Sequence, residues 1–462
     1  MRLKNIIAAL ALTGAAGIMS AQTPKYIFYY IGDGMGLGPV MTAENYNRMV
    51  LGNDTPLLML QMPVVGWCMT YSASAPITDS AAAGTALSTG FKTKNSMLGM
   101  NPDTVSVARM LKDEGYGVGV VTSVAPDDAT PGAFYAHVPN RKMYYEIDRQ
   151  MAESGYDFIA GAGLRGLKDA DGKPTDALSH FADNNVQLVY GPEEIAGISS
   201  EKVVLLNPRD THDWNIGYTI DSISGVLDLP LIAQTCLRQL EKNSPDRFFM
   251  MVEGGNIDHA LHANDGGAAV KEILNFNQAL QVAFDFYKEH PDETLIIVTA
   301  DHDTGGMAFV HPKLKSKAAS QLGVFDWQKV SKETFNDYCK SVLKSRSIYT
   351  WDDMKQYLSD NFGLFTNIPL DEAQEAALRE NFDATFERRN TADQETLYAS
   401  FNAFAVDVFD LLSKAAGVAF TTTSHSSNPV PVCAIGVGAD NFKGLNNNID
   451  IPRKIRMLTE KK

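Results

Sequence analysis

A serine at the start of an alanine-rich stretch is the first residue whose type and position could do chemistry. Ser80 follows Asp79 and precedes three alanines, and the stretch runs to Gly90. Asp79 or Ser80 can cap a helix, and glycine often ends one. A serine in the first helical turn lies where the backbone dipole favours negative charge, which suits a hydroxyl that must become an alkoxide. The same pattern also fits a plain helix cap, so the choice depends on the rest of the chain.

A carboxylate and an imidazole occur four residues apart in the segment IDHALH. Asp258 and His262 share one face if this segment is helical. Together they could provide half of a zinc site. His259 would then point elsewhere on the helix. The same spacing is also ordinary on helix surfaces, where it binds nothing.

Further possible metal ligands stand next to apolar runs. Asp301 and His302 come directly after the run at 293–299, and adjacent residues can face one ion where a strand turns into a loop. His425 precedes the apolar run at 430–437. Each of these positions also fits a polar turn or a merely structural histidine, so none of them identifies a metal site by itself.

Oxygen donors and a cation complete the candidates. Glu253 closes an apolar run at 247–252, and Thr130 precedes a proline. Carboxylates and a hydroxyl, with no softer ligand, suit a hard ion such as Mg²⁺. Arg141 could grip two oxygens of a phosphate through its guanidinium, or it could be a solvated cation at a helix start. Together, the candidates suffice for two ions with nitrogen and oxygen ligands and one ion with oxygen ligands.

The elements that must position these residues alternate between buried strands and helices. Apolar runs rich in β-formers predict strands at residues 25–31, 62–72, 117–124, 247–252, 293–299 and 430–437. Helical patterns occur at residues 78–90, 105–115, 229–243, 268–289 and 451–459. This alternation predicts an α/β fold with a central, mainly parallel sheet that is sandwiched by helices.

In such sheets, ligands bind beyond the carboxyl ends of the strands. The residues just after each strand are therefore expected to meet at one site. They are residues 32–34, 79–80, 127–130, 253–255, 301–303 and 424–425. Asp33 belongs to the first of these groups and stands between two glycines.

One long segment differs from the rest of the chain. Residues 312–418 are rich in Lys, Glu, Gln, Asn and aromatic residues, and amphipathic patterns predict helices at 371–389 and 394–412. We expect a mostly helical insertion within a catalytic domain at 22–462. The insertion separates His302 from His425 and has no catalytic constellation of its own.

The N-terminus has the pattern of a secretory signal. A basic start, an apolar stretch and a small residue before a polar one predict a signal peptide at residues 1–21, and hence a periplasmic or secreted protein. The alternative is an N-terminal membrane anchor, for which the apolar stretch is short. We expect no membrane span elsewhere in the chain.

Charge and cysteine content narrow the possible partners. A formal net charge of −15 argues against nucleic acid and anionic membranes, although not against a small anionic substrate. Cys68, Cys236, Cys339 and Cys433 form no C-x-x-C pair, which excludes a zinc knuckle and a dithiol redox motif. They allow three disulfide pairings or none, and apolar surroundings favour buried free thiols at Cys68 and Cys433.

Seven segments, in this order, resemble the alkaline phosphatase family of metal-dependent phosphomonoesterases. They are residues 33–36, 78–82, 88–95, 128–131, 252–254, 257–258 and 299–302. The resemblance spans most of the chain outside the insertion. It implies a homodimer that hydrolyses small phosphate monoesters, with Ser80 as the nucleophile that becomes phosphoserine and Arg141 as the clamp on the phosphate.

The resemblance also implies three metal ions and their ligands. One Zn²⁺ would be held by Asp258, His262 and His425, and the second Zn²⁺ by Asp33, Ser80, Asp301 and His302. One Mg²⁺ would be held by Asp33, Thr130 and Glu253. Asp79 and Asp128 would support these ligands from behind. Asp128 and His259 match positions that vary in the family: Asp128 favours magnesium in the third site, and His259 replaces a possible cation near the bound substrate.

Other functions remain alternatives at this point. A phosphodiesterase of the same superfamily would not need Arg141. A sulfatase would place a modifiable residue in a C/S-x-P-x-R setting, which the sequence after Ser80 lacks. A non-catalytic protein that binds metal or phosphate would not need a serine at a helix start beside metal ligands.

Overall fold

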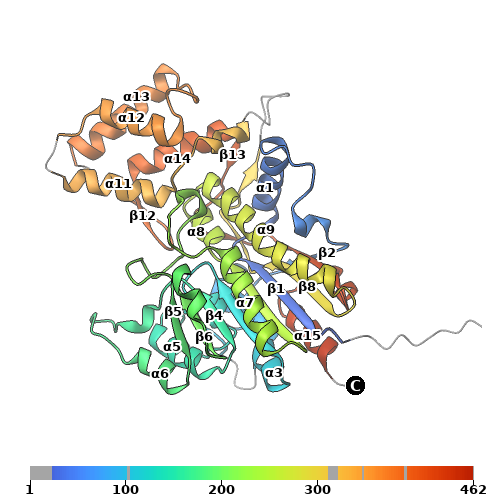
Figure 1. The fold of residues 1–462 in the computed structure, drawn as a ribbon. Coiled ribbons are helices and arrows are strands. Elements are labelled where there is room, and N and C mark those ends of the chain that lie inside the picture. Colours follow the sequence, from blue (N-terminus) through green and yellow to red (C-terminus); the bar gives the residue numbers. More distant parts are fainter. Residues whose placement is uncertain (1–22, 101–104, 311–320, 346–347, 390–392, 461–462) are drawn as a thin grey trace, which may run out of the picture.

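The computed structural model describes residues 23–100, 105–310, 321–345, 348–389 and 393–460. The signal peptide expected at residues 1–21 lies outside these residues. Ten of the described strands form one central sheet, in the order β16-β2-β15-β8-β1-β7-β3-β4-β6-β5 (Figure 1). In chain order, the sheet strands are β1 (Tyr26–Gly32), β2 (Val64–Met69), β3 (Gly117–Thr122), β4 (Phe158–Gly161), β5 (Gln187–Tyr190), β6 (Val203–Leu206), β7 (Phe248–Gly254), β8 (Thr294–Ala300), β15 (Val430–Gly436) and β16 (Gly444–Asn447).

The sheet is mainly parallel, as predicted. β15 runs antiparallel to both of its neighbours, β2 and β8, and the other described neighbours in the sheet run parallel. The predicted strands correspond to β1, β2, β3, β7, β8 and β15. The four-residue strands β4, β5, β6 and β16 were not predicted, because runs this short carry little periodic signal.

Two neighbouring tyrosines of β1 show that helices cover both faces of the sheet. The hydroxyl of Tyr29 donates to the carbonyl of Leu87 in α2, whereas that of Tyr30 donates to Ala279 in α9. Successive side chains of a strand point to opposite faces, so α2 and α9 lie on opposite sides. The helices outside the insertion are α1 (Leu37–Met49), α2 (Ser80–Thr89), α3 (Val107–Asp113), α4 (Ala129–Gly132), α5 (Tyr144–Glu153), α6 (Ala177–Asp183), α7 (Leu229–Asn243), α8 (Asn256–His262), α9 (Gly266–Glu289) and α15 (Asp450–Thr459).

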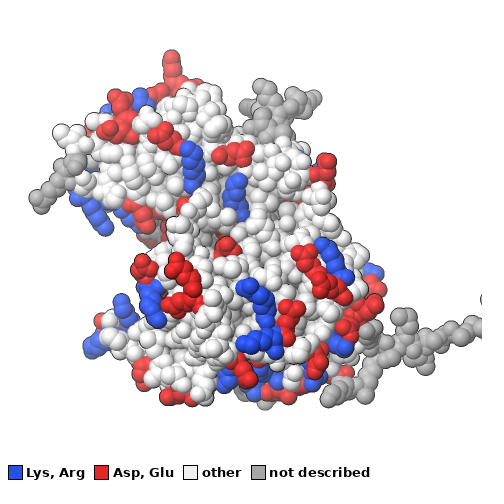
Figure 2. Space-filling model, viewed as in Figure 1, with Lys and Arg blue, Asp and Glu red and all other residues white. Residues whose placement is uncertain are grey.

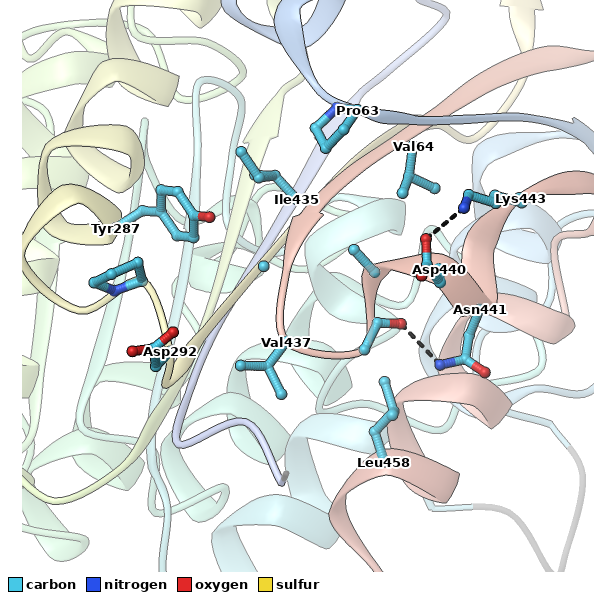
Figure 3. Close-up of a pocket in the computed structure, with 14 residues that line it drawn as sticks. Pro63, Val64, Tyr287, Asp292, Ile435, Val437, Asp440, Asn441, Lys443 and Leu458 are labelled. Carbon is cyan, nitrogen blue, oxygen red and sulfur yellow. Dashed lines mark hydrogen bonds and ion pairs between the residues drawn. The ribbon is translucent and has the colours of Figure 1, made fainter. Parts of the chain in front are cut away.

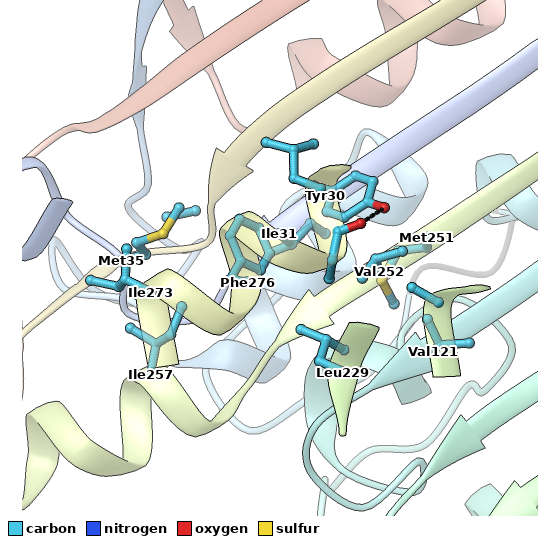
Figure 4. Close-up of a cluster of buried hydrophobic side chains, with 14 of the residues drawn as sticks. Tyr30, Ile31, Met35, Val121, Leu229, Met251, Val252, Ile257, Ile273 and Phe276 are labelled. Carbon is cyan, nitrogen blue, oxygen red and sulfur yellow. Dashed lines mark hydrogen bonds between the residues drawn. The ribbon is translucent and has the colours of Figure 1, made fainter. Parts of the chain in front are cut away.

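A dense apolar core lies between the sheet and the helices of one face. Figure 4 shows Val252 of β7 with Leu229 of α7, Ile257 of α8 and Phe276 of α9. Each of these side chains is buried. Burying a side chain of this size contributes roughly 1.5–3 kcal/mol, so the helices are held firmly against the strands whose ends carry the candidate residues.

The insertion is largely helical and lies at one end of the molecule (Figure 1). It contains α11 (Lys332–Lys344), α12 (Trp351–Phe362), α13 (Glu372–Phe382), a π-helical turn (Asp383–Glu387), the hairpin of β11 (Asp393–Glu395) and β12 (Ser400–Asn402), and α14 (Ala403–Ala416). The helix predicted at 394–412 is wrong in its first part, because residues 393–402 form the hairpin. Helix α14 begins only after Asn402, whose side chain accepts from the backbone N–H of Ala405 and caps the helix.

Two short ladders close the base of the insertion. β9 (Asp303–Thr304) pairs with β14 (His425–Ser426), and β10 (Ala308–Phe309) pairs with β13 (Val418–Ala419). We call these two ladders the stem. The stem brings His425 back beside the end of β8, although more than a hundred residues separate the two in sequence.

The distribution of surface charge and the state of the cysteines agree with what the sequence predicts. Figure 2 shows acidic and basic side chains intermixed on the visible face, without a continuous basic stripe. In the part of the chain that the structure describes, all four cysteines are free and buried. No helix within the described ranges is long and apolar enough to cross a membrane.

Candidate active site

Ser80 occupies the first turn of α2, and Asp79 is the residue that caps this helix. One carboxylate oxygen of Asp79 accepts from the backbone N–H of Ala82 at 3.0 Å, and the other accepts from Ser96 at 2.8 Å. Ser80 is 1% exposed. Its Oγ lies 3.2 Å from Nε2 of His302. The helix therefore aims the serine at a histidine that follows β8.

Asp258, His262 and His425 form one cluster of possible ligand atoms. Nε2 of His262 lies 3.3 Å from Oδ2 of Asp258 and 3.0 Å from Nε2 of His425. The opposite nitrogen of each ring faces a backbone carbonyl: Nδ1 of His262 lies 2.6 Å from Thr423, and Nδ1 of His425 lies 2.8 Å from Thr78. A carbonyl can only accept, so Nδ1 carries the proton in both rings. In its neutral form, each ring therefore directs the lone pair of Nε2 at the carboxylate of Asp258 or at the other ring.

Asp33, Asp301 and His302 form a second cluster. Nε2 of His302 lies 3.1 Å from Oδ2 of Asp301 and 3.5 Å from Oδ1 of Asp33. The hydroxyl of Thr304 donates to Oδ1 of Asp258 and lies 3.2 Å from Nδ1 of His302. Because this hydroxyl donates its only proton to the carboxylate, it can only accept a hydrogen bond from His302. Nδ1 of His302 therefore carries the proton, and Nε2 again presents a lone pair. Thr304 thus links the two clusters.

A glycine allows these two clusters to approach each other. Gly34 follows Asp33 and has a φ of 67°, which is in the left-handed region. A Cβ at this position would lie 2.6 Å from Oδ1 of Asp258. The backbone N–H of Gly34 donates to Asp301 at 3.1 Å. Any larger residue here would push the loop after β1 away from α8.

Four buried carboxylate oxygens, three in these clusters and one on the nearby Glu253, have no hydrogen-bond partner among the described residues. They are Oδ1 of Asp33, Oε1 of Glu253, Oδ2 of Asp258 and Oδ2 of Asp301. Burial and neighbouring carboxylates raise the pKa of Asp33 well above its usual value and that of Asp301 to about 7. Buried carboxylates and opposed lone pairs are costly unless a cation or protons compensate them. The clusters therefore fit divalent ions with nitrogen and oxygen ligands.

Asp33, Thr130 and Glu253 offer a third donor set, made of oxygen atoms. The hydroxyl of Thr130 lies 3.5 Å from Oδ2 of Asp33. The hydroxyl of Thr122 donates to Oε2 of Glu253, while burial raises the pKa of Glu253 to about 8. A set of carboxylate and hydroxyl oxygens fits a hard ion such as Mg²⁺.

Arg141 is held by two acidic side chains instead of being solvated. Its Nη2 donates to Oδ1 of Asp128 at 2.9 Å, and its Nη1 lies 3.7 Å from Oδ2 of Asp79. Nη2 of Arg165 donates to the other oxygen of Asp128 at 2.6 Å. Although Asp128 is buried, the two arginines hold its pKa well below the usual range. Arg141, Arg165 and Asp128 line a cavity of about 710 Å³, which we call the catalytic cavity.

His259 points away from the metal-ligand clusters, as its helical position predicts. Its ring lies in the catalytic cavity, 3.9 Å between centroids from Tyr398. Burial lowers the pKa of His259 to about 4, although the charge of Asp128 opposes this shift. This lowered pKa favours the neutral form of the ring.

Sequence reasoning missed three residues at this site. Thr304 orients two of the clusters, Arg165 shares Asp128 with Arg141, and Tyr398 covers His259 from the insertion. Arg165 follows β4, so the rule about strand ends would have found it had β4 been predicted. Nothing in the sequence around Tyr398 indicates that the hairpin returns to the site.

Another cavity, of about 680 Å³, lies at the opposite ends of the sheet strands, near the beginning of β8 (Figure 3). It is lined by Tyr287, Asp292, Ile435 and Asp440, among others. Gly436, at the end of the antiparallel β15, is paired with the beginning of β8, so this cavity is remote from the residues that follow β8. None of the candidate site residues named above lines it.

Comparisons with known proteins point to one family. A sequence model described as "Alkaline phosphatase" matches residues 24–164 and 215–460. Alkaline phosphatase 4 of Bacillus subtilis is 27% identical over 441 residues, covering 92% of this chain and 87% of the relative.

Two solved structures extend this similarity to the fold. The cold-active alkaline phosphatase of Shewanella sp. has a TM-score of 0.77 and 25% identity, covering 94% of this chain and all of the other. A histidine-to-aspartate variant of the enzyme from the Antarctic bacterium TAB5 has a TM-score of 0.64 and 26% identity, covering 96% of this chain and 99% of the other. That variant is described with Mg bound in a site called M3.

Proposed function

The chain belongs to the alkaline phosphatase family, and from this premise we propose that it hydrolyses phosphate monoesters through a phosphoserine on Ser80. Membership makes the protein a phosphomonoesterase of a metal-dependent family. The observation that carries the proposed mechanism is the short approach of Ser80 Oγ to His302, beside two clusters of unsatisfied ligand atoms.

The proposed nucleophile is the hydroxyl oxygen of Ser80. Its Oγ forms a bond to phosphorus while the bond from phosphorus to the alcohol oxygen breaks, and the alcohol takes up a proton. Water then cleaves the phosphoserine, releasing phosphate and restoring the serine. The dipole of α2 stabilises negative charge on Ser80 by only about 0.3–1 kcal/mol. This is too little to ionise a serine near neutral pH.

The missing stabilisation is assigned to metal ions. We propose that Asp258, His262 and His425 hold one zinc ion and that Asp33, Ser80, Asp301 and His302 hold the second. Bound ions of this kind supply Lewis acidity, which lowers the pKa of a hydroxyl and neutralises charge on reacting oxygens. The opposed lone pairs of the histidines and the unpaired carboxylate oxygens of Asp33, Asp258 and Asp301 support this assignment.

Magnesium is proposed for the third donor set, of Asp33, Thr130 and Glu253. The oxygen-only composition of the set supports a hard ion. So does the similar TAB5 variant, which is described with Mg bound and carries an aspartate in place of a histidine. In this chain an aspartate, Asp128, stands two residues before Thr130 of the proposed magnesium site.

Arg141 is the proposed clamp on the phosphoryl group. Asp128 and Asp79 fix the guanidinium in the wall of the catalytic cavity. Asp79 also caps α2, so one side chain sets both the serine and the arginine. A guanidinium grips two oxygens of a phosphate. A monoester offers one more charged oxygen than a diester, so the clamp favours monoesters.

The test is hydrolysis of 4-nitrophenyl phosphate, with bis(4-nitrophenyl) phosphate and 4-nitrophenyl sulfate assayed in parallel. The monoester is expected to react much faster than the others, and a chelator is expected to abolish the reaction until zinc and magnesium are restored. Equal or faster hydrolysis of the diester would make the protein a phosphodiesterase instead. Activity that survives complete metal removal would overturn the metal assignment.

Location and assembly are proposed on separate grounds. The basic and apolar pattern of residues 1–21 supports export to the periplasm or medium. Fractionation of producing cells and sequencing of the mature N-terminus test it. A homodimer is proposed from the family resemblance, and light scattering of the purified protein tests it.

A further inference from the structure

A second cavity lies beside the catalytic cavity, beyond the outer strands of the sheet. It has a volume of about 500 Å³ and is lined by residues after β4, by the last residues of β5 and β6, by residues after β6, and by Leu178 of α6. Arg165 and Trp214 line both cavities. The two cavities are therefore neighbours at the carboxyl ends of the strands, where parallel sheets bind their ligands. We call this second space the outer cavity.

The outer cavity is built mainly from a segment that the family model does not match. That model leaves out residues 165–214, and this segment supplies all the lining residues except Ala162, Gly163 and Leu164. Ser80, Arg141 and the proposed metal ligands lie in the matched stretches. Every phosphate monoester shares the phosphoryl group and differs in its alcohol. A wall that lies outside the family-matched stretches, beside a site that lies within them, is therefore placed to select the alcohol.

Flat aromatic and cationic groups characterise the outer cavity. The rings of His212 and Trp214 are stacked, with centroids 4.7 Å apart and planes at 12°. Trp214 is 43% exposed. Burial lowers the pKa of His212, so this stacked pair is neutral. The guanidinium of Arg209 lies 3.4 Å over the ring of Tyr190. Exposed aromatic faces and arginine planes are the groups on which nucleobases stack.

Asp128 connects the outer cavity to the proposed phosphate clamp. One oxygen of Asp128 accepts from Arg141 at 2.9 Å and the other accepts from Arg165 at 2.6 Å. Arg165 also packs over the ring of Tyr144 at 4.6 Å. An ester whose phosphoryl group rests on Arg141 thus has Arg165 and Trp214 as the next walls along which its alcohol can extend.

We propose that the outer cavity binds the nucleoside part of a nucleotide whose phosphate is removed at Ser80. The base stacks on the exposed face of Trp214, and the cation of Arg209 faces the sugar or a further phosphate. This inference rests on the proposed function and adds a substrate class to it. Simple sugar phosphates would use the catalytic cavity without the outer one.

The experiment compares kcat/KM for adenosine 5′-monophosphate with that for ribose 5-phosphate, which lacks the base. The wild-type holoenzyme is expected to prefer the nucleotide by about tenfold or more, the usual effect of stacking one base. Trp214→Ala is expected to remove most of this preference, and Arg209→Ala to reduce it. Trp214→Phe keeps an aromatic face and is expected to restore it.

Two matched substitutions serve as controls. Trp327→Ala removes a tryptophan of nearly the same exposure, 44%, which does not line either cavity. Arg247→Ala removes another arginine that packs over a tyrosine, at 5.0 Å from the ring of Tyr116, also outside both cavities. Both controls are expected to keep the preference of the wild type.

Three results would overturn the inference: no preference in the wild type, equal losses for both substrates in Trp214→Ala, or the same change in the controls. If neither substrate were hydrolysed, the proposed function would fail instead. Calorimetric titration with adenosine then still tests the outer cavity. Binding that Trp214→Ala abolishes and Trp214→Phe retains supports the inference, and absence of binding to the wild type overturns it.

Discussion

The Oγ of Ser80 and the Nε2 of His302 lie 3.2 Å apart. Because Nδ1 of His302 donates to Thr304, Nε2 presents a lone pair to the serine hydroxyl. The ring can therefore accept the serine proton as a hydrogen bond or bind a cation that both residues share. In either case the serine is held at the edge of the ligand clusters, which places it where a nucleophile is needed.

Ser80→Ala is expected to lower kcat by about 10³-fold or more, because the covalent route is lost. Metal content should stay close to that of the wild type, since six other proposed ligands remain around the two proposed zinc positions. Steady-state kinetics and elemental analysis measure both. Ser88→Ala is the matched control: Ser88 is a buried serine of the same helix whose hydroxyl donates to Ala133. Wild-type turnover in Ser80→Ala would exclude Ser80 as nucleophile.

Thr304→Val should weaken zinc binding without unfolding the protein. The hydroxyl of Thr304 contacts the carboxylate of Asp258 in one cluster and the ring of His302 in the other. Loss of such a supporting group typically lowers metal affinity by about 10–100-fold. Competition with a zinc chelator measures the affinity, and circular dichroism checks the fold. Thr421→Val removes a threonine between β13 and β14 that donates to Gly305, and it should leave the affinity unchanged. If both variants lose zinc equally, Thr304 has no specific role.

Arg141→Ala should reduce kcat/KM for a phosphate monoester by about 10²-fold or more, because a donor to the charged transition state is lost. Hydrolysis of a diester should suffer much less. Arg141→Lys should fall between the two, since an ammonium cannot form the two-pronged contact. The measurement is kcat/KM of each variant for the monoester and for the diester. Losses of the same size for both esters would count against the clamp.

Tyr398 tests whether the insertion takes part in substrate binding. Its ring lies 3.9 Å from that of His259 and 5.2 Å from that of His262, and burial keeps its hydroxyl neutral by raising its pKa. Tyr398→Phe should behave like the wild type, whereas Tyr398→Ala should raise KM about three- to tenfold through lost ring contacts. Tyr349→Ala, elsewhere in the insertion, is the control. A larger defect in Tyr398→Phe than in Tyr398→Ala would refute the ring-contact explanation.

Lys332 should make stability depend on alkaline pH. It is 2% exposed, and its ammonium donates to the carbonyl of Ala263 at the end of α8. Burial lowers its pKa from 10.5 to about 8. Below pH 8 both the folded and unfolded chains hold the proton, so the cost of the buried charge is fully present. Between pH 8 and 10.5 the unfolded chain binds more protons, and the free energy of unfolding rises with pH.

The size of this rise is about 3 kcal/mol at most, from the difference between the two pKa values. Urea unfolding of the wild type and of Lys332→Met at pH 7.5, 9 and 10.5 isolates it, because other groups titrate alike in both proteins. The wild type should gain stability relative to the variant as pH rises. A constant difference between the two proteins would show that Lys332 is not the cause.

The sheet and most of its ligand-bearing ends were predictable because the central strands are long and uniformly apolar. β1, β7 and β8 are each seven residues long and fully buried, so their composition is unambiguous. The outer strands β4, β5 and β6 have four residues each, too few for a pattern. The insertion was misjudged at 394–402, because a short polar hairpin and an amphipathic helix look alike over so few residues.

The candidate ligands were predictable from the rule that strand ends converge, together with the family resemblance. Their supporting contacts were not. Thr304 acts through its hydroxyl on residues far away in sequence, Arg165 depends on a strand that the sequence hides, and Tyr398 reaches the site only because of how the insertion folds. Such contacts are properties of tertiary packing, so local patterns do not reveal them.

The stem gives the molecule a modular character. Because β9 pairs with β14 and β10 with β13, the two ends of the insertion are joined to each other by antiparallel strand pairs. Closing a loop costs only about 0.6 kcal/mol more for each doubling of its length. The segment beyond the stem can therefore be lengthened, shortened or exchanged while His425 keeps its place beside His302. During evolution, the part of the insertion that lines the catalytic cavity, including Tyr398, can thus change while the candidate ligands at the strand ends stay in place.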